Sequence, residues 1–279
     1  MMMKKLPLVG AVCAATLMAA ACSSTESQVP DNCKSEWNFP TVSSGVLKVA
    51  AVQQLPSVDV SPNGDVQGID STLLPDFAMQ ACLTIAWQPL AGPAAVSALS
   101  EGKVDIGAGG WYKTPARGKV VGQTDTVWYD SPAIVSNSGY RSIESLSGKK
   151  IGVVGGSLFE APIKEAVGDN NVVVFQSIDA VFQELASGRI DAGLGSGAVL
   201  THQVSTRNSD AKVETLSPDA RYPKLTSPGE PNYPYTKSNT ELGAALNSFI
   251  TAAREDGTVR DALEQNGLSA PSYFTGPQS

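Results

Sequence analysis

The chain has 279 residues, a formal net charge of −7, and 42% hydrophobic and 17% charged residues. These values predict one large or two ordinary globular domains. They argue against a nucleic-acid partner, because phosphate binding needs clustered Lys and Arg. His202 is the single histidine. This excludes a His-rich zinc site and a pair of histidines for acid–base catalysis. We expect no metal and no cofactor.

The first 21 residues have the pattern of an export signal. Lys4 and Lys5 give a positive start, and residues 6–21 form an apolar stretch too short for a comfortable membrane span. Three alanines before Cys22 resemble the lipobox of bacterial lipoproteins, although Ala19 stands where that motif has Leu. We expect cleavage before Cys22 and lipid on it, anchoring the protein on the extracytoplasmic face of the cell membrane. A plain secretory signal is the alternative. Loss of the signal leaves 18 basic and 27 acidic residues, a net charge of −9.

The remaining cysteines suggest a covalent link. Cys13 would leave with the signal and Cys22 would carry lipid, so Cys33 and Cys82 form an even pair in an oxidising compartment. We expect a disulfide between them that ties the N-terminal arm to the first helix. Two buried thiols are the alternative.

Strand-like and helix-like segments then alternate along the chain. Residues 46–52, 84–87 and 104–108 are predicted strands. The helices between and after them are predicted at 70–83, at 94–100 and from near Pro115. Pro75 inside the first of these predicts a start at Leu74 or a kink.

The same rhythm repeats in the second half. Strands are predicted at 150–154, 172–175, 190–194 and 212–216. Helices are predicted at 159–166, 178–187, 198–206, 241–256 and 259–265. A Pro-rich loop covers 217–234. This pattern predicts an α/β fold with two comparable halves.

Several short motifs follow one another along the chain. They are KVDIGAGG followed by WYKTPARGKVV at 103–121, SLSGKKIGV at 145–153, GGS at 155–157, LASGRIDA at 185–192, NTEL at 239–242 and DGT at 256–258. These motifs, in this order, resemble those of bacterial extracellular solute-binding proteins that serve polar-amino-acid ABC importers. The similarity runs from about residue 46 to 265.

The resemblance implies a type II periplasmic-binding-protein fold, with two α/β lobes, a hinge and a ligand cleft between the lobes. Residues 1–21 would be the signal and 22–45 the lipidated N-terminus and tether. Lobe 1 would be 46–131 plus 235–279, and lobe 2 would be 132–234. Closure of the lobes around a ligand is a known form of hinge motion.

The implied function is capture of a small carboxylate-bearing solute, an amino acid or a related compound, for delivery to a membrane permease and its ATPase subunit. The protein would be a monomer and would catalyse no reaction.

Arg117 is the first candidate for ligand contact. The resemblance gives it a paired contact with the ligand's carboxylate, and its guanidinium presents two parallel donors to two oxygens. Thr114 would add a hydroxyl or backbone N–H, and Gly110 also belongs to this segment. In lobe 2, Gly156 and Ser157 open a helix and could bind the same anion. The alternative for Arg117 is a surface arginine without ligand contact. The alternative for Ser157 is an ordinary N-cap of the helix.

Two positions depart from the amino-acid binders of this family. In those proteins an Asp after a lobe 2 strand receives the ligand's α-ammonium group, and by count Ser196 stands there. Gly92 stands where an aromatic residue precedes the helix at 94–100. A buried ammonium without a counter-ion is costly. A carboxylate is therefore favoured, and an α-amino group is left open.

Bulky side chains occupy the opposite wall. Trp111 and Tyr112 stand where small or hydroxyl residues are common, and Trp111 could stack on a planar or cationic ligand group or pack between the lobes. Gln53, just after the first strand, could offer an amide.

The sequence also has features of three other functions. Gly193, Gly195 and Ala198 match the dinucleotide pattern G-x-G-x-x-A, with Glu214 at a plausible distance, but a single match is weak. A dehydratase built on this fold would need a cleft acid. Ala116 stands where a Glu is common beside Arg117, and nothing pairs Asp130 with Glu160. An extracytoplasmic ligand sensor would need a separate signalling chain.

Overall fold

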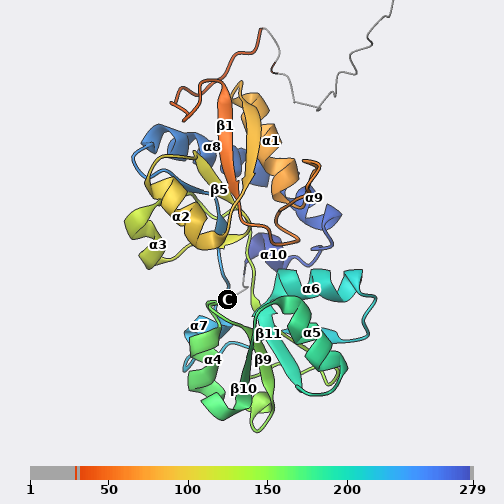
Figure 1. Ribbon diagram of the computed structural model, residues 1–279. Coiled ribbons are helices and arrows are strands. Elements are labelled where there is room, and N and C mark those ends of the chain that lie inside the picture. Colours follow the sequence, from red (N-terminus) through yellow and green to blue (C-terminus); the bar gives the residue numbers. More distant parts are fainter. Residues whose placement is uncertain (1–28, 30–31, 277–279) are drawn as a thin grey trace, which may run out of the picture.

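Two five-stranded sheets, one in each lobe, organise the part of the chain that the computed structural model describes, residue 29 and residues 32–276 (Figure 1). The expected two-lobe α/β fold is confirmed. The export signal, Cys13 and Cys22 lie outside the described residues. Within those residues, no helix combines the length and apolar character needed to cross a membrane.

The sheet of lobe 1 is built around β1 (Val46–Ala51). This strand runs parallel to β4 (Thr84–Pro89) on one side and to β5 (Ile106–Ala108) on the other. The order β4-β1-β5-β14-β7 is completed by β14 (Pro234–Tyr235) and β7 (Gly122–Gln123), and β14 is antiparallel to both of its neighbours. The run VLKVAA of β1 is apolar at five of six positions because helices cover both faces of the sheet.

The helices of lobe 1 come from both ends of the chain. They are α1 (Asp70–Gln80), α2 (Gly92–Ser100), α3 (Pro115–Val120), α8 (Thr240–Glu255), α9 (Thr258–Gln265) and α10 (Ser272–Thr275). α1 starts at Asp70 and runs through Pro75, so it does not start at Leu74. Phe77 of α1 meets Phe249 of α8 edge to face, with ring centroids 5.5 Å apart, and closes the core of this lobe.

The sheet of lobe 2 has the order β10-β9-β11-β8-β12. Its strands are β8 (Pro132–Ser136), β9 (Ile151–Val154), β10 (Val172–Phe175), β11 (Ala192–Ser196) and β12 (Lys212–Thr215). β9, β10 and β11 are parallel, whereas β8 is antiparallel to β11 and β12. β8 was not among the predicted strands, although all five of its residues are buried.

Four helices flank the second sheet: α4 (Glu160–Val167), α5 (Ile178–Ala186), α6 (Gly197–Thr206) and α7 (Pro223–Thr226). α7 lies inside the predicted Pro-rich loop, and it forms there because Leu225 is completely buried in the core of lobe 2. Short 3₁₀ turns occur at Glu144–Leu146 and Asp169–Asn171.

Two small antiparallel ribbons lie outside the main sheets. β2 (Asp59–Val60) pairs with β3 (Val66–Gln67) in the segment between β1 and α1. β6 (Trp111–Tyr112) pairs with β13 (Pro231–Asn232).

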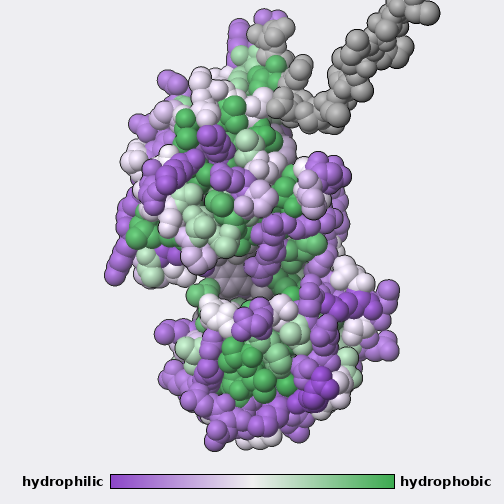
Figure 2. Space-filling model, in the orientation of Figure 1, coloured by the Kyte–Doolittle hydropathy of each residue, from purple (hydrophilic) through white to green (hydrophobic). Residues whose placement is uncertain are grey.

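The chain passes between the lobes twice, and the two crossings are hydrogen-bonded to each other. Asp130 and Gly229 exchange backbone hydrogen bonds of 3.0 and 2.8 Å, and Val127 N–H donates to Pro231 O at 2.9 Å. Tyr129 N–H also donates to Tyr273 O of α10 at 2.8 Å. The molecule is recessed between the lobes at this level (Figure 2).

The predicted disulfide is confirmed. Cys33 and Cys82 are bonded with S–S 2.00 Å, which joins the N-terminal arm to the segment directly after α1. Among the described residues, no group of three or more His, Cys, Asp or Glu side chains is arranged to hold a metal ion.

Candidate functional site

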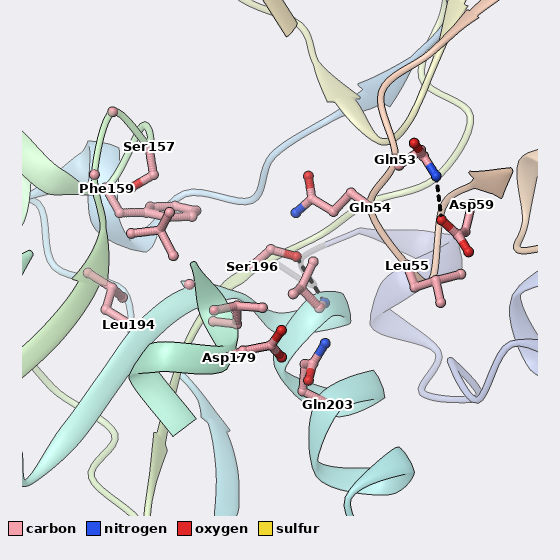
Figure 3. Close-up of a pocket in the computed structure, with 16 residues that line it drawn as sticks. Gln53, Gln54, Leu55, Asp59, Ser157, Phe159, Asp179, Leu194, Ser196 and Gln203 are labelled. Carbon is pink, nitrogen blue, oxygen red and sulfur yellow. Dashed lines mark hydrogen bonds between the residues drawn. The ribbon is translucent and has the colours of Figure 1, made fainter. Parts of the chain in front are cut away.

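Two adjoining cavities lie between the lobes. The larger has a volume of about 670 Å³ and the smaller about 230 Å³. Both are lined by Gln54, Gly156, Ser157, Phe159, Ser196 and Val199. In the larger cavity, Gln53, Gln54 and Asp59 of lobe 1 face side chains of lobe 2 (Figure 3). Arg117, Tyr112 and Asp130 line the smaller one.

Arg117 is fixed at the smaller cavity by its own lobe. Its guanidinium lies over the ring of Trp111, 5.0 Å from the centroid, and Nη1 donates to Tyr112 O at 2.7 Å. Partial burial lowers the pKa of Arg117 below its usual range. A guanidinium has five N–H donors. The contacts within the described residues use one of them, so several remain for an anion.

Thr114 lies behind Arg117 and lines neither cavity. Its hydroxyl caps α3 by accepting from Arg117 N–H at 3.2 Å. Its backbone N–H donates to Gln123 Oε1 at 2.8 Å, and Gln123 Nε2 donates back to Thr114 O at 3.1 Å. In this arrangement Thr114 holds the first turn of α3, and with it Arg117, in place.

The two bulky residues of β6, Trp111 and Tyr112, lie in different places, one in the core and one at the smaller cavity. Trp111 is 5% exposed, donates its indole N–H to Ala108 O at 3.0 Å, and lines neither cavity. Tyr112 lines the smaller cavity. Gly110 also lines it, with φ +66°, and a Cβ there would come within 2.6 Å of Ser57 Oγ. This position therefore needs glycine for both its backbone and its close packing.

Asp130 is a cavity residue that sequence reasoning missed. It is 2% exposed, its Oδ2 accepts from the Tyr112 hydroxyl at 2.8 Å and from the Ser196 hydroxyl, and its Oδ1 accepts from Ala198 N–H at 3.0 Å. Burial raises the pKa of Asp130, and these hydrogen bonds oppose that rise. A detectable signal was an acid two residues before the apolar run PAIVS of β8.

The loop between β9 and α4 brings one unpaired hydroxyl into the cleft. Gly156 N–H donates to Glu160 Oε2 at 2.7 Å, and Glu160 also pairs with Lys164 at 2.6 Å. That backbone donor is therefore already occupied. Ser157 Oγ is buried, lines both cavities, and has no hydrogen-bond partner among the described residues.

Ser196 ends β11 and caps α6. Its hydroxyl accepts from Val199 N–H at 3.2 Å while donating to Asp130. Gln53 also lines the larger cavity, with its amide held by Asp59 at 2.7 Å. The structure thus brings Arg117, Gly110, Tyr112, Gly156, Ser157 and Ser196 to one cleft and places Thr114 and Trp111 behind it.

Comparison with known proteins gives this cleft its context. The model of the bacterial extracellular solute-binding proteins, family 3, matches residues 47–268. The chain belongs to this family.

Individual proteins similar to this solute-binding protein are also binding proteins by name. The putative ABC transporter arginine-binding protein 2 of Escherichia coli (strain K12) is 28% identical over 205 residues, which are 73% of this chain and 82% of that protein. The histidine-binding periplasmic protein of the same organism is 28% identical over 206 residues, 70% of this chain and 76% of that one. A solved structure titled as an ancestral arginine-binding protein bound to glutamine has a TM-score of 0.65 at 28% identity, covering 80% of this chain and 98% of that one.

In this solute-binding protein the glycine pattern of β11 has a packing role. A Cβ on Gly193 would lie 2.6 Å from Val181 Cγ1 and 2.9 Å from Val135 Cγ1. Gly195 lines the larger cavity. The glycines of the G-x-G-x-x-A match therefore have two roles. Gly193 allows α5 and β8 to pack closely on β11, and Gly195 lines the cleft.

Proposed function

We propose that the protein is the substrate-binding subunit of an ABC importer and captures a polar amino acid or a related carboxylate between its lobes. One observation carries this proposal. Arg117 of lobe 1 and the unpaired hydroxyl of Ser157 of lobe 2 line the same cavity. A carboxylate held by Arg117 would give Ser157 the acceptor that it lacks, so one ligand would join the two lobes.

The fixed guanidinium favours a carboxylate over a neutral ligand. Trp111 and Tyr112 O hold Arg117 from behind, which reduces the entropy lost when an anion binds. A planar guanidinium matches the two oxygens of a carboxylate with two parallel hydrogen bonds.

The polar lining of the larger cavity favours a ligand with a polar side chain. Its rim carries the amides of Gln53, Gln54 and Gln203 and the carboxylates of Asp59 and Asp179. The similarity to proteins named for arginine and histidine, and to a structure titled as bound to glutamine, supports the same class of ligand.

The proposal also includes where the protein lies in the cell envelope and which subunits it works with. The family is extracellular by description, and the signal pattern before Cys22 supports a lipid anchor on the outer face of the cell membrane. A membrane permease and an ATPase subunit would be the partners, and the protein would act as a monomer.

We propose a binding protein and not an enzyme. Glu160, one of the two acids considered for catalysis, is paired with Lys164 and lines neither cavity. Asp130 accepts hydrogen bonds from the hydroxyls of Tyr112 and Ser196 and from Ala198 N–H. Neither of these two acids is therefore free for acid–base work in the cleft.

A thermal-shift screen of the twenty amino acids, simple carboxylates, amines and sugars tests this function. A ligand that binds the folded state raises the unfolding temperature by mass action. We expect a rise with at least one polar amino acid, and the same screen on Arg117→Ala should lose it. A rise only with sugars or amines would contradict the proposal.

A further inference from the structure

A third cavity, of about 280 Å³, lies on the opposite side of the crossings from the ligand cleft. Asp130 lines the smaller cavity of the cleft, whereas its neighbours Tyr129 and Ser131 line this third cavity. Successive side chains of an extended segment point to opposite sides, so the first crossing separates the two spaces. Helix α6 is divided in the same way, with Val199 toward the cleft and Thr201 toward the third cavity. We call this third cavity the back groove.

The end of the chain forms the lobe 1 side of the back groove. Ser269, Ala270, Ser272 and Tyr273 line it, and the last two belong to α10. α10 stands beside α6 at the level of the crossings (Figure 1). Thr201 of α6 and residues of β8 and β12 line the lobe 2 side. The back groove is therefore bounded by both lobes, as the ligand cleft is.

Arg254 of α8 clamps α10 to the first crossing. Its Nη1 donates to Val127 O at 2.6 Å, and its Nη2 donates to Phe274 O at 2.8 Å. Its guanidinium also lies over the ring of Phe274, 4.7 Å from the centroid. The donors of a guanidinium form a rigid fork, so the two carbonyl oxygens that it holds keep a fixed spacing. α10 therefore moves with lobe 1 when the lobes rotate.

Tyr273 of α10 reaches across the back groove to lobe 2. Its carbonyl oxygen accepts from Tyr129 N–H at 2.8 Å, which fixes its backbone on the first crossing. Its hydroxyl lies 3.4 Å from Thr201 Oγ1 of α6, within hydrogen-bond distance. Burial raises the pKa of Tyr273 to about 12, so the hydroxyl keeps its proton at neutral pH. The pair is a direct contact between the C-terminal segment and lobe 2.

The place of this contact determines its effect on closure. The lobes rotate about the crossings, so a rotation that narrows the cleft on one side widens the back groove on the other. The distance between Tyr273 Oη and Thr201 Oγ1 then increases, and the contact breaks. A ligand that joins Arg117 to Ser157 favours the narrower cleft. The contact between Tyr273 and Thr201 therefore opposes ligand binding.

We propose that Tyr273 is a positioning residue that sets ligand affinity from behind the cleft, by holding lobe 2 through Thr201 in a more open arrangement. This inference rests on the proposed function, because it takes the cleft as the ligand site. The apparent Kd is larger than that of the closed arrangement by the inverse of the closed population. Loss of the contact should therefore tighten binding, whereas general damage to the fold would weaken it.

Calorimetric titration of the full-length protein with L-arginine, L-glutamine and L-histidine tests the sign of this effect. Tyr273→Phe and Thr201→Val each remove one hydroxyl and keep the size of the side chain. We expect each variant to lower the Kd of the tightest-binding probe by about two- to tenfold, the equivalent of one neutral hydrogen bond. The double variant should bind no more tightly than either single variant, because all three lose the same contact.

Thr206→Val is the matched control. Thr206 also belongs to α6, but its hydroxyl donates to His202 O within the helix, and it lines none of the three cavities. The substitution makes the same chemical change as Thr201→Val in the same helix. It should leave the Kd unchanged.

A distance measurement without ligand tests the arrangement of the lobes itself. Lys119 of α3 and Glu165 of α4 are exposed, and their helices stand on either side of the cleft (Figure 1). Spin labels attached there through unnatural amino acids give the distribution of distances between the lobes by pulsed electron paramagnetic resonance. Tyr273→Phe and Thr201→Val should each increase the share of the shorter distances, and Thr206→Val should not.

The outcomes separate this inference from the proposed function. Unchanged or weaker binding of the probe by both single variants overturns the role of Tyr273 and leaves the proposed function standing. Equal tightening by Thr206→Val also overturns that role. If none of the three probes binds, the proposed function fails and the distances alone decide: a larger share of shorter distances in the two variants supports the contact, and an unchanged distribution overturns it.

Discussion

The guanidinium of Arg117 lies over the indole ring of Trp111, with 5.0 Å between the guanidinium carbon and the ring centroid. Trp111 belongs to a core cluster of lobe 1, so the stack joins the cleft to the interior of that lobe. A cation over an aromatic face is stabilised by about 0.5–2 kcal/mol, depending on burial. A buried ring therefore determines where the positive charge of the cleft stands.

The stack predicts different effects for two substitutions of Trp111. Trp111→Phe keeps an aromatic face under Arg117, whereas Trp111→Leu does not. Both should lower the free energy of unfolding, since both lose indole volume and the bond to Ala108 O. Trp111→Leu should weaken amino-acid binding by about 0.5–2 kcal/mol more than Trp111→Phe. Urea denaturation and calorimetric titration measure the two effects, and equal affinities in both variants would show that the stack does not position Arg117.

Two serines of the cleft should respond to Ala in opposite ways. Ser157 Oγ has no partner to lose, so Ser157→Ala should leave the free energy of unfolding unchanged or slightly raised and weaken ligand binding by about 0.5–1.5 kcal/mol. Ser196→Ala removes the cap of α6 and a donor to Asp130, and should destabilise the fold by about 1–3 kcal/mol. Equal destabilisation by both substitutions, measured by urea denaturation, would contradict this reading of Ser157.

Local pattern was enough to predict most elements. α5 is an example, predicted at 178–187 and found at Ile178–Ala186, because Val181, Phe182 and Leu185 form one apolar face and Ser177 caps its start. β8 was missed because its five residues are all buried, which removes the alternation that marks a strand, and because it begins with Pro132.

The site was only partly predictable for a different reason. Arg117 could be found from a local motif, whereas the role of Asp130 depends on partners far along the chain. Tyr112 is 18 residues away and Ser196 is 66 residues away. Sequence showed an acid without a partner, and only the packing of the two lobes supplies the partners. The same packing places Thr114 behind Arg117, whereas the family resemblance suggested ligand contact.

Asp70 should make the stability of the fold depend on pH. Its side chain accepts from Gly109 N–H at 2.8 Å and the Tyr233 hydroxyl at 3.1 Å, and burial raises its pKa from 3.8 to about 7. Between these values the folded protein holds a proton that the unfolded chain has released. The free energy of unfolding should therefore fall as pH rises through this window, by up to about 1.4 kcal/mol per pH unit from this group.

Asp70→Asn removes this contribution. The free energy of unfolding of the variant, relative to the unmodified protein, should rise from about pH 4 to about pH 7 and level off above. Urea denaturation across that range measures the difference. Parallel profiles for the two proteins would show that Asp70 does not titrate in this window.

The disulfide should contribute to stability and not to binding. Cys33 and Cys82 are 49 residues apart, and closing a loop of this length in the unfolded chain is worth about 4 kcal/mol before any strain is counted. The double change Cys33→Ser and Cys82→Ser should lower the free energy of unfolding by up to this amount. Ligand affinity should stay the same, because neither residue lines the cleft. A comparable loss of affinity in the double variant would place the link within the binding mechanism.

Calorimetric titration of the unmodified protein, Arg117→Ala and Arg141→Ala with the amino acid that gives the largest thermal shift tests the central claim most directly. Arg141 is an exposed arginine that pairs with Glu214 on lobe 2 and serves as the control. Arg117→Ala should lose about 1.5–3 kcal/mol of binding free energy, roughly tenfold to 150-fold in Kd, and Arg141→Ala should bind as the unmodified protein does. Equal affinity of Arg117→Ala and the unmodified protein would contradict the assignment of Arg117 as the carboxylate anchor of the cleft.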